Sequence, residues 1–212
     1  MSLEDLIERL QELDLLLDTD PKFPSVTGFV ADTGGRSWWA HPEAKQMYGL
    51  SCGLRDHPDV LMVKLVSGKL TFVHRPLWAA IVAIGTAREP WQMDGLSKEA
   101  KALLKKADGG GKIESSGDPV RELENRLLAH AVSVHTEHGH HMKEVQSWAA
   151  WAKSVKLGEV KLTPDEARAQ IESVVARLNK QFGAKGTLPW HTKKALARVP
   201  TRQARVRTPR KS

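Results

Sequence analysis

Four histidines and one glutamate occur within seven positions, in the stretch HTEHGHH at residues 135–141. Imidazole nitrogens and carboxylate oxygens are common ligands of transition metals. On a helix, Glu137 and His138 lie four and three residues before His141, so these three side chains could approach one ion. The spacing therefore suggests a divalent transition-metal site formed by Glu137, His138 and His141. Such a site needs further ligands from another element, for which the candidates are His74, Asp56 and His57.

A purely structural role for these histidines is the competing explanation. On a helix covering residues 119–153, His130 and His141 share an apolar face with Trp148, where their ring nitrogens would bond to neighbours. We favour this explanation because the established zinc spacings are missing. HExxH requires a glutamate directly after the first histidine, and the H-x-E of zinc deaminases requires two downstream cysteines. We therefore expect no cofactor, and keep a transition metal as the alternative.

Motifs of other enzyme classes are missing from the sequence. There is no G-x-S-x-G, P-loop or dinucleotide-binding glycine pattern, and the glycines at 109–111 follow a predicted helix without the Lys-Ser/Thr of a phosphate loop. The single cysteine, Cys52, permits no internal disulfide. No set of residues in the sequence demands catalysis.

Positive charge is concentrated at the C-terminal end. The formal net charge is +7, from 32 Lys and Arg against 25 Asp and Glu. Residues 187–212 hold eight basic and no acidic side chains, so the rest of the chain has a net charge of −1. The basic residues of this tail are Lys193, Lys194, Arg198, Arg202, Arg205, Arg207, Arg210 and Lys211.

This composition favours binding to nucleic acid, because a cationic arm neutralises phosphates and releases counterions. The tail has little to bury and is expected to be disordered when free. If all eight charges met phosphates, log Kd would change with log salt with a slope of about 7. Lys64, Lys69 and Arg75, in and after a predicted hairpin, would add contacts along the same backbone. A solubilising tail, or one that binds acidic proteins or anionic membranes, is the alternative.

The hydrophobic spacing predicts a mainly helical chain with one antiparallel hairpin. Ser2 caps an amphipathic helix with apolar residues from Leu3 to Leu17. Ser67-Gly68 separates two apolar segments as a two-residue turn, pairing Leu65 with Leu70, Val63 with Phe72 and Leu61 with His74 on a buried face. KIES, at 112–115, suggests a short strand. Further helices are expected over 42–56, 76–87, 97–107, 119–155 and 163–182.

A helix followed by a hairpin, and the stretch LSKEAKALLKKADGGGKI before the helix at 119, resemble winged-helix DNA-binding modules. The resemblance covers about residues 40–153 in two pieces and implies an α+β, winged-helix-like fold, in one or two units. The first piece shows one obvious helix before its hairpin, where the family has three. The predicted division is an N-terminal helix at 1–20, a helix-hairpin-helix unit at 21–95, a helical unit at 96–190 and the tail at 191–212.

Tryptophans at two places could bind a ligand or stabilise the core. Trp38 and Trp39 directly precede the helix at 42–56, where they could form a stacking platform for a nucleobase. Core anchoring of that helix is the explanation we favour. Trp148 and Trp151, three residues apart, indicate helix packing.

These observations lead to three hypotheses. The first is a non-enzymatic nucleic-acid-binding protein, with DNA as the partner. The second is a metal-dependent or DNA-repair enzyme that uses the histidine-rich stretch. The third is a helical interaction module, for instance a homodimer through residues 3–17. The sequence has no apolar run of 18 residues and an acidic, amphipathic N-terminus, so we expect a cytoplasmic protein with no membrane partner.

Overall fold

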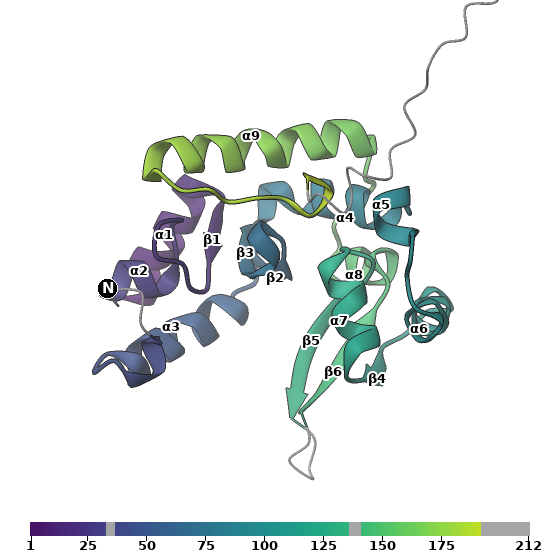
Figure 1. Ribbon diagram of the computed structural model, residues 1–212, viewed down its shortest axis with the longest axis horizontal. Helices are drawn as coiled ribbons and strands as arrows, with labels where there is room; N and C mark the ends of the chain where they lie inside the picture. The colour runs from purple at the N-terminus through teal and green to yellow at the C-terminus, as the bar shows by residue number, and fades with distance from the viewer. Residues whose placement is uncertain (33–36, 136–140, 192–212) are drawn as a thin grey trace, which may run out of the picture.

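The computed structural model describes residues 1–32, 37–135 and 141–191. The fold is α+β, with helices around two small three-stranded antiparallel sheets (Figure 1). The first sheet lies on one side of the molecule with α1 (Leu3–Leu13), α2 (Val26–Val30) and α3 (Ala44–Arg55). The second sheet lies on the other side with α7 (Asp118–Asn125) and α8 (Trp148–Ser154). Across the described residues, every helix is too short or too polar to span a lipid bilayer.

In the first sheet, one strand follows the first helix and the other two strands follow the third helix. Its strands occur in the order β1-β3-β2, so the first strand pairs with the last. The elements are α1 (Leu3–Leu13), β1 (Leu15–Leu17), α2 (Val26–Val30), α3 (Ala44–Arg55), β2 (Val60–Lys64) and β3 (Leu70–His74).

Helix α1 is shorter than the predicted apolar face. Ser2 caps its start in a reciprocal capping box with Asp5, as the sequence indicated. It ends at Leu13 because Asp14 adopts the left-handed conformation, with a φ of 67°. Residues 15–17 then form β1, so their prediction as helix is wrong. The apolar residues of α1 and β1 are buried against the chain's own core, so a dimer through them would require these elements to detach.

The predicted hairpin is confirmed, but its register differs by one residue. Lys64 pairs with Leu70 and Leu61 with Val73, instead of Leu65 with Leu70 and Leu61 with His74. The turn has Ser67 at its centre, and the Ser67 amide donates a 2.7 Å hydrogen bond to the Thr187 carbonyl. A distant segment therefore fixes the turn. Contrary to the predicted faces, Thr71 and Val73 are buried and Leu70 is exposed.

The second sheet replaces most of the long helix predicted over 119–155. Here α7 ends at Asn125, and Leu127 has a φ of 51°, which stops the helix and redirects the chain. Strands β5 and β6 then pair from His130–Gln146 to His135–His141. The short strand predicted at KIES is confirmed as β4, and the sheet order is β4-β6-β5. The elements are α6 (Lys98–Asp108), β4 (Ile113–Ser115), α7 (Asp118–Asn125), β5 (His130–His135), β6 (His141–Gln146) and α8 (Trp148–Ser154).

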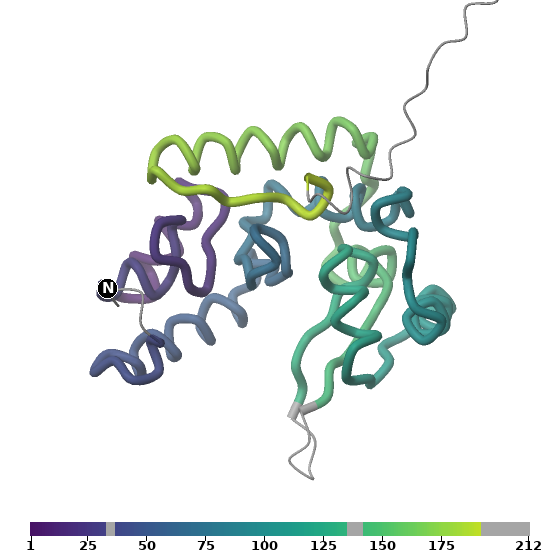
Figure 2. Tube along the Cα trace, viewed as in Figure 1, coloured from purple at the N-terminus to yellow at the C-terminus, as the bar shows by residue number. Residues whose placement is uncertain are grey.

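The larger core joins both parts of the chain. Helix α4 (Trp78–Thr86) is buried on most sides, and α9 (Pro164–Phe182) lies across it. After α9 the chain returns along this helix to a 3-10 turn at Pro189–His191 (Figure 2). Trp148 and Trp151 of α8 join the same core, as their spacing indicated, with ring centroids 5.6 Å apart. Helix α5 (Pro90–Met93) leads to α6 and a smaller second core.

Candidate nucleic-acid interface

Helix α3 presents one face to the core and the opposite face to solvent. Its buried face consists of Met47, Leu50 and Leu54. Residues 45, 48, 49, 52 and 55 follow one another at helical spacing on the other side, which places Lys45, Tyr48 and Arg55 on one stripe. All three side chains are exposed. A helix with one apolar and one polar face is oriented by its core contacts, so this stripe is held toward solvent.

The cations of this stripe differ in their partners. Arg55 Nε lies 3.1 Å from Asp56 Oδ1 in a surface ion pair, which also raises the pKa of Arg55. Lys45 has no ion pair with any carboxylate among the described residues. Tyr48 lies between them, and a hydrogen bond with Cys52 raises its pKa. The stripe therefore offers one free ammonium, one guanidinium and a neutral phenol.

Gly49 leaves the centre of the stripe open. A Cβ added to Gly49 would meet nothing within 4 Å, whereas one added to Gly53, on the core side, would lie 2.9 Å from Leu3 Cδ2. The two glycines therefore affect different surfaces of α3. Gly53 lets α1 pack closely on α3, and Gly49 leaves the backbone of α3 accessible from solvent.

Three aromatic rings gather where α3 begins. Trp38 and Trp39 form a 3-10 turn with Ala40 and stack with ring centroids 3.9 Å apart at an interplanar angle of 23°. The ring centroid of Tyr48 lies 5.9 Å from that of Trp39. Trp39 is 65% exposed and Tyr48 51% exposed. The expectation that the tryptophan pair anchors α3 in the core is therefore wrong, because neither ring is buried.

The predicted hairpin cations are each paired within the protein. Lys69 Nζ lies 2.8 Å from Asp20 Oδ2, and Arg75 Nη1 lies 3.0 Å from Asp59 Oδ1. The Arg75 guanidinium also lies 5.2 Å from the Trp78 ring. A phosphate would have to compete with these carboxylates. Lys64 is more enclosed and lies against the second sheet.

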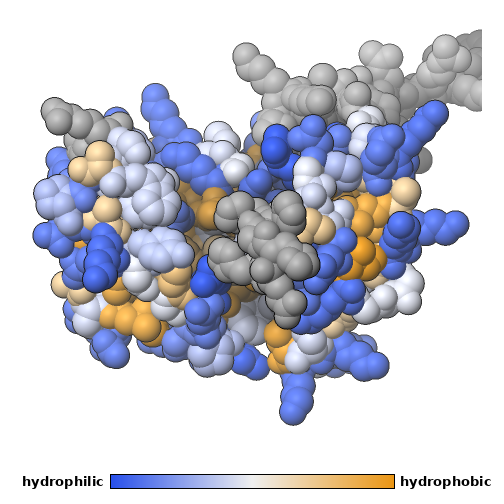
Figure 3. Space-filling view, turned by 90° about the horizontal axis from the view of Figure 1, so that it is seen from below, coloured by the Kyte–Doolittle hydropathy of each residue, from blue (hydrophilic) through white to orange (hydrophobic). Residues whose placement is uncertain are grey.

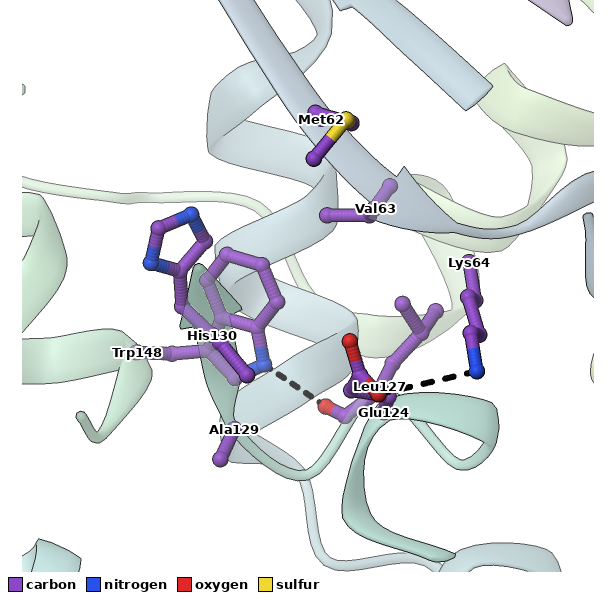
Figure 4. A pocket seen from close by; sticks show the side chains of 9 residues that line it. Met62, Val63, Lys64, Glu124, Leu127, Ala129, His130 and Trp148 are labelled. Atoms are coloured by element: carbon purple, nitrogen blue, oxygen red, sulfur yellow. Dashed lines mark hydrogen bonds and ion pairs between the residues drawn. The ribbon is translucent and has the colours of Figure 1, made fainter. Parts of the chain in front are cut away.

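A pocket between β2 and the second sheet holds a buried carboxylate (Figure 4). Glu124 of α7 is 9% exposed and forms ion pairs with Lys143 and with Lys64, whose Nζ is 3.6 Å from Glu124 Oε2. In the same pocket, Trp148 Nε1 donates a 2.7 Å hydrogen bond to the Leu127 carbonyl. Both lysines pair with this one carboxylate, so the cluster joins the two parts of the chain, and a phosphate would have to compete with Glu124 for them.

His130 lines the same pocket and is kept neutral. It is 7% exposed, contacts the rings of Trp148 and Trp151, and has Nδ1 3.3 Å from Gln146 Nε2. Burial, together with the positive charge of Lys112, lowers the pKa of His130 from 6.5 to about 4. This histidine packs beside Trp148 as expected, although it does so from a strand.

The remaining predicted site residues fall outside what the structure describes. Glu137 and His138 lie in the gap at 136–140, and the side chain of His141 is not described although its backbone belongs to β6. All eight basic residues of the tail lie in 192–212. Within the described residues, no three His, Cys, Asp or Glu side chains converge to hold a metal ion, and the three proposed extra ligands are not brought together.

Lys45, Tyr48 and Arg55 were not among the predicted binding residues. Their helical spacing within the helix predicted at 42–56 was a usable signal, since it separates them from Met47, Leu50 and Leu54. Comparisons with protein-family profiles, with curated proteins and with solved structures find no match for this chain.

Proposed function

We propose that this chain binds nucleic acid, with duplex DNA as its partner, through a winged-helix arrangement in its N-terminal part. The order of elements supports this proposal. Three helices, α1, α2 and α3, precede the hairpin β2–β3. The winged-helix family has three helices in this place, whereas the sequence pattern predicted one obvious helix there. β1 joins the sheet beside β3.

The second sheet provides further support because it uses the same connections. In both sheets the first strand pairs with the third, and the third with the second. A helix precedes the first strand in each, α1 before β1 and α6 before β4. One helix, α7, stands between β4 and β5, where α2 and α3 stand between β1 and β2. The second part is thus a shorter version of the first, in which α7 directly precedes the hairpin as α3 does, with no second helix among the described residues between β4 and β5.

The exposed face of α3 is the observation that carries the proposal. In helix-turn-helix proteins, the helix that reads DNA lies in the major groove with its polar face toward the bases. Helix α3 has 12 residues and so extends about 18 Å, enough to cross a groove about 12 Å wide. Lys45 and Arg55 stand near opposite ends, where phosphates border the groove. Gly49, between them, allows the backbone to approach closely.

The tail would supply most of the salt-dependent affinity in this proposal. Residues 192–212 carry all eight tail cations. Fully extended, these 21 residues would reach at most about 70 Å, the length of about 20 base pairs. Lys69 and Arg75 would lie along the DNA backbone as secondary contacts. Lys64 is no longer included, because it is less exposed than Lys69 and Arg75, which also have carboxylate partners, and it lies against the second sheet beside Glu124.

Binding across a salt series, by the full chain and by residues 1–191, tests this function. We expect the full chain to bind duplex DNA with a steep salt dependence, and residues 1–191 to bind it more weakly with a shallower slope. Single-stranded DNA and RNA of equal length serve as comparisons. If residues 1–191 did not bind duplex DNA at all, or if the full chain bound the three nucleic acids with equal affinity, α3 would not be the helix that recognises duplex DNA.

A further inference from the structure

The rings of Trp38, Trp39 and Tyr48 form an exposed aromatic cluster with no role in the core. Only four large apolar side chains among the described residues are substantially exposed, and Trp39 and Tyr48 are the two most exposed of them. On the face seen in Figure 3, the side chains of highest hydropathy reach the surface in separate patches among hydrophilic ones. Contiguous exposed apolar surface is uncommon on soluble proteins and is typical of interaction sites, which makes this cluster a candidate binding site.

The cluster is held in place by its own backbone. The His41 amide donates a 3.0 Å hydrogen bond to the Trp38 carbonyl, and the Ala44 amide donates one of 3.0 Å to the His41 carbonyl. These bonds connect the 3-10 turn of the tryptophans to the start of α3. Trp38 supports Trp39 from the inner side, since Trp38 is partly buried and Trp39 is the outer ring. The outer ring is therefore positioned before any ligand arrives.

A nucleobase is the ligand that suits this arrangement. Two nearly parallel rings 3.9 Å apart can be extended by a third flat ring at a similar spacing, as bases stack on aromatic side chains in nucleic-acid-binding proteins. Lys45, one helical turn before Tyr48, is the cation of the stripe that has no carboxylate partner among the described residues. Glu43 and Asp56 are the acidic residues nearest the stripe in sequence, and Asp56 is occupied by Arg55. The cluster is thus continuous with the proposed DNA-binding face.

We propose that Trp39, supported by Trp38, stacks on an unpaired base next to the duplex that α3 binds. This inference rests on the proposed function and names its substrate class, a duplex that contains an unpaired base. Bases inside an intact duplex are stacked on one another, so a ring outside the groove meets a free base only where pairing is interrupted. The chain should therefore prefer interrupted duplexes to intact ones.

Two DNA probes with the same number of phosphates test this preference. Both are duplexes with one 2-aminopurine, placed opposite thymine in one probe and opposite an abasic site in the other. We expect the full chain to bind the second probe more tightly, by about 5- to 150-fold, the range known for one base stacked on an aromatic ring. The fluorescence of the 2-aminopurine opposite the abasic site should be quenched when the chain binds.

Variants of Trp39 separate stacking from general affinity. Trp39→Ala should abolish the preference and the quenching, which brings the affinity for the interrupted probe down to that for the paired probe. Trp39→Phe should keep part of both. Because Trp39 is exposed, neither variant should alter the urea midpoint of unfolding.

Equal wild-type affinity for the two probes, or an equal loss of affinity for both probes with Trp39→Ala, would overturn the stacking inference and leave the proposed function standing. Failure of the wild type to bind either probe would overturn both.

Discussion

The indole of Trp148 lies directly against Gly85, so close that a methyl group on Gly85 would overlap the ring. Gly85 belongs to α4 and Trp148 to α8, so this contact joins the two parts of the chain. The same indole donates its N–H to the Leu127 carbonyl and contacts His130. Trp148 is therefore the residue through which α4, the turn after α7 and β5 are held together.

Gly85→Ala should destabilise the fold. The added methyl group would displace the buried Trp148 ring, and overpacking of this kind costs about 1–3 kcal/mol. Gly49→Ala is the matched control, because Gly49 is also within a helix but has nothing within 4 Å of the added atom. It should stabilise the protein by about 0.5–1 kcal/mol. Urea unfolding of both variants checks this, and equal effects would show that the Trp148 contact is not tight.

His130 should make stability depend on pH between about 4 and 6.5. Its pKa is about 4 in the folded chain and 6.5 when unfolded, so in this window the unfolded chain binds a proton that the folded chain does not. The free energy of unfolding should therefore fall as the pH falls, by up to about 3 kcal/mol. Urea titrations at pH 7, 5.5 and 4.5 measure it. His130→Asn should flatten this dependence; an identical pH profile in the variant would refute the assignment.

Glu124→Gln should destabilise the junction between β2 and the second sheet. The substitution keeps the shape of the side chain but leaves the half-buried ammonium groups of Lys64 and Lys143 without a counter-charge. We expect a loss of about 1–3 kcal/mol in urea unfolding. Glu159→Gln, which removes an exposed carboxylate paired with Lys161, should change stability by less than about 0.5 kcal/mol. Similar values for the two variants would mean that the buried pairs contribute little.

Local signals in the sequence located most element starts. Ser2, Ser97 and Thr163 cap α1, α6 and α9, because their side chains accept hydrogen bonds from amides in the first turn of each helix. The Ser67-Gly68 turn identified the first hairpin. These features depend on neighbours in the sequence, so they can be recognised without knowing the fold.

Features that depend on distant contacts were missed. The turn of the first hairpin bonds to Thr187, more than a hundred residues away, and Leu127, where the chain turns after α7, accepts a hydrogen bond from the distant Trp148. His130 fits the apolar face of a helix as well as it fits β5, because a short apolar segment has no unique period. At the site, adjacent Trp38 and Trp39 could not be assigned to core or surface from spacing alone.

The salt dependence of duplex DNA binding by a Lys45→Gln, Arg55→Gln double variant of the full chain tests whether α3 is the DNA-binding helix. If α3 contacts DNA, log Kd against log salt should become shallower by about 1–2 and affinity should fall about tenfold at low salt. Lys101→Gln with Lys105→Gln, on the exposed face of α6, removes the same charge elsewhere and should have a smaller effect. Equal effects of the two double variants, with both proteins folded, would contradict the assignment of α3 as the DNA-binding helix.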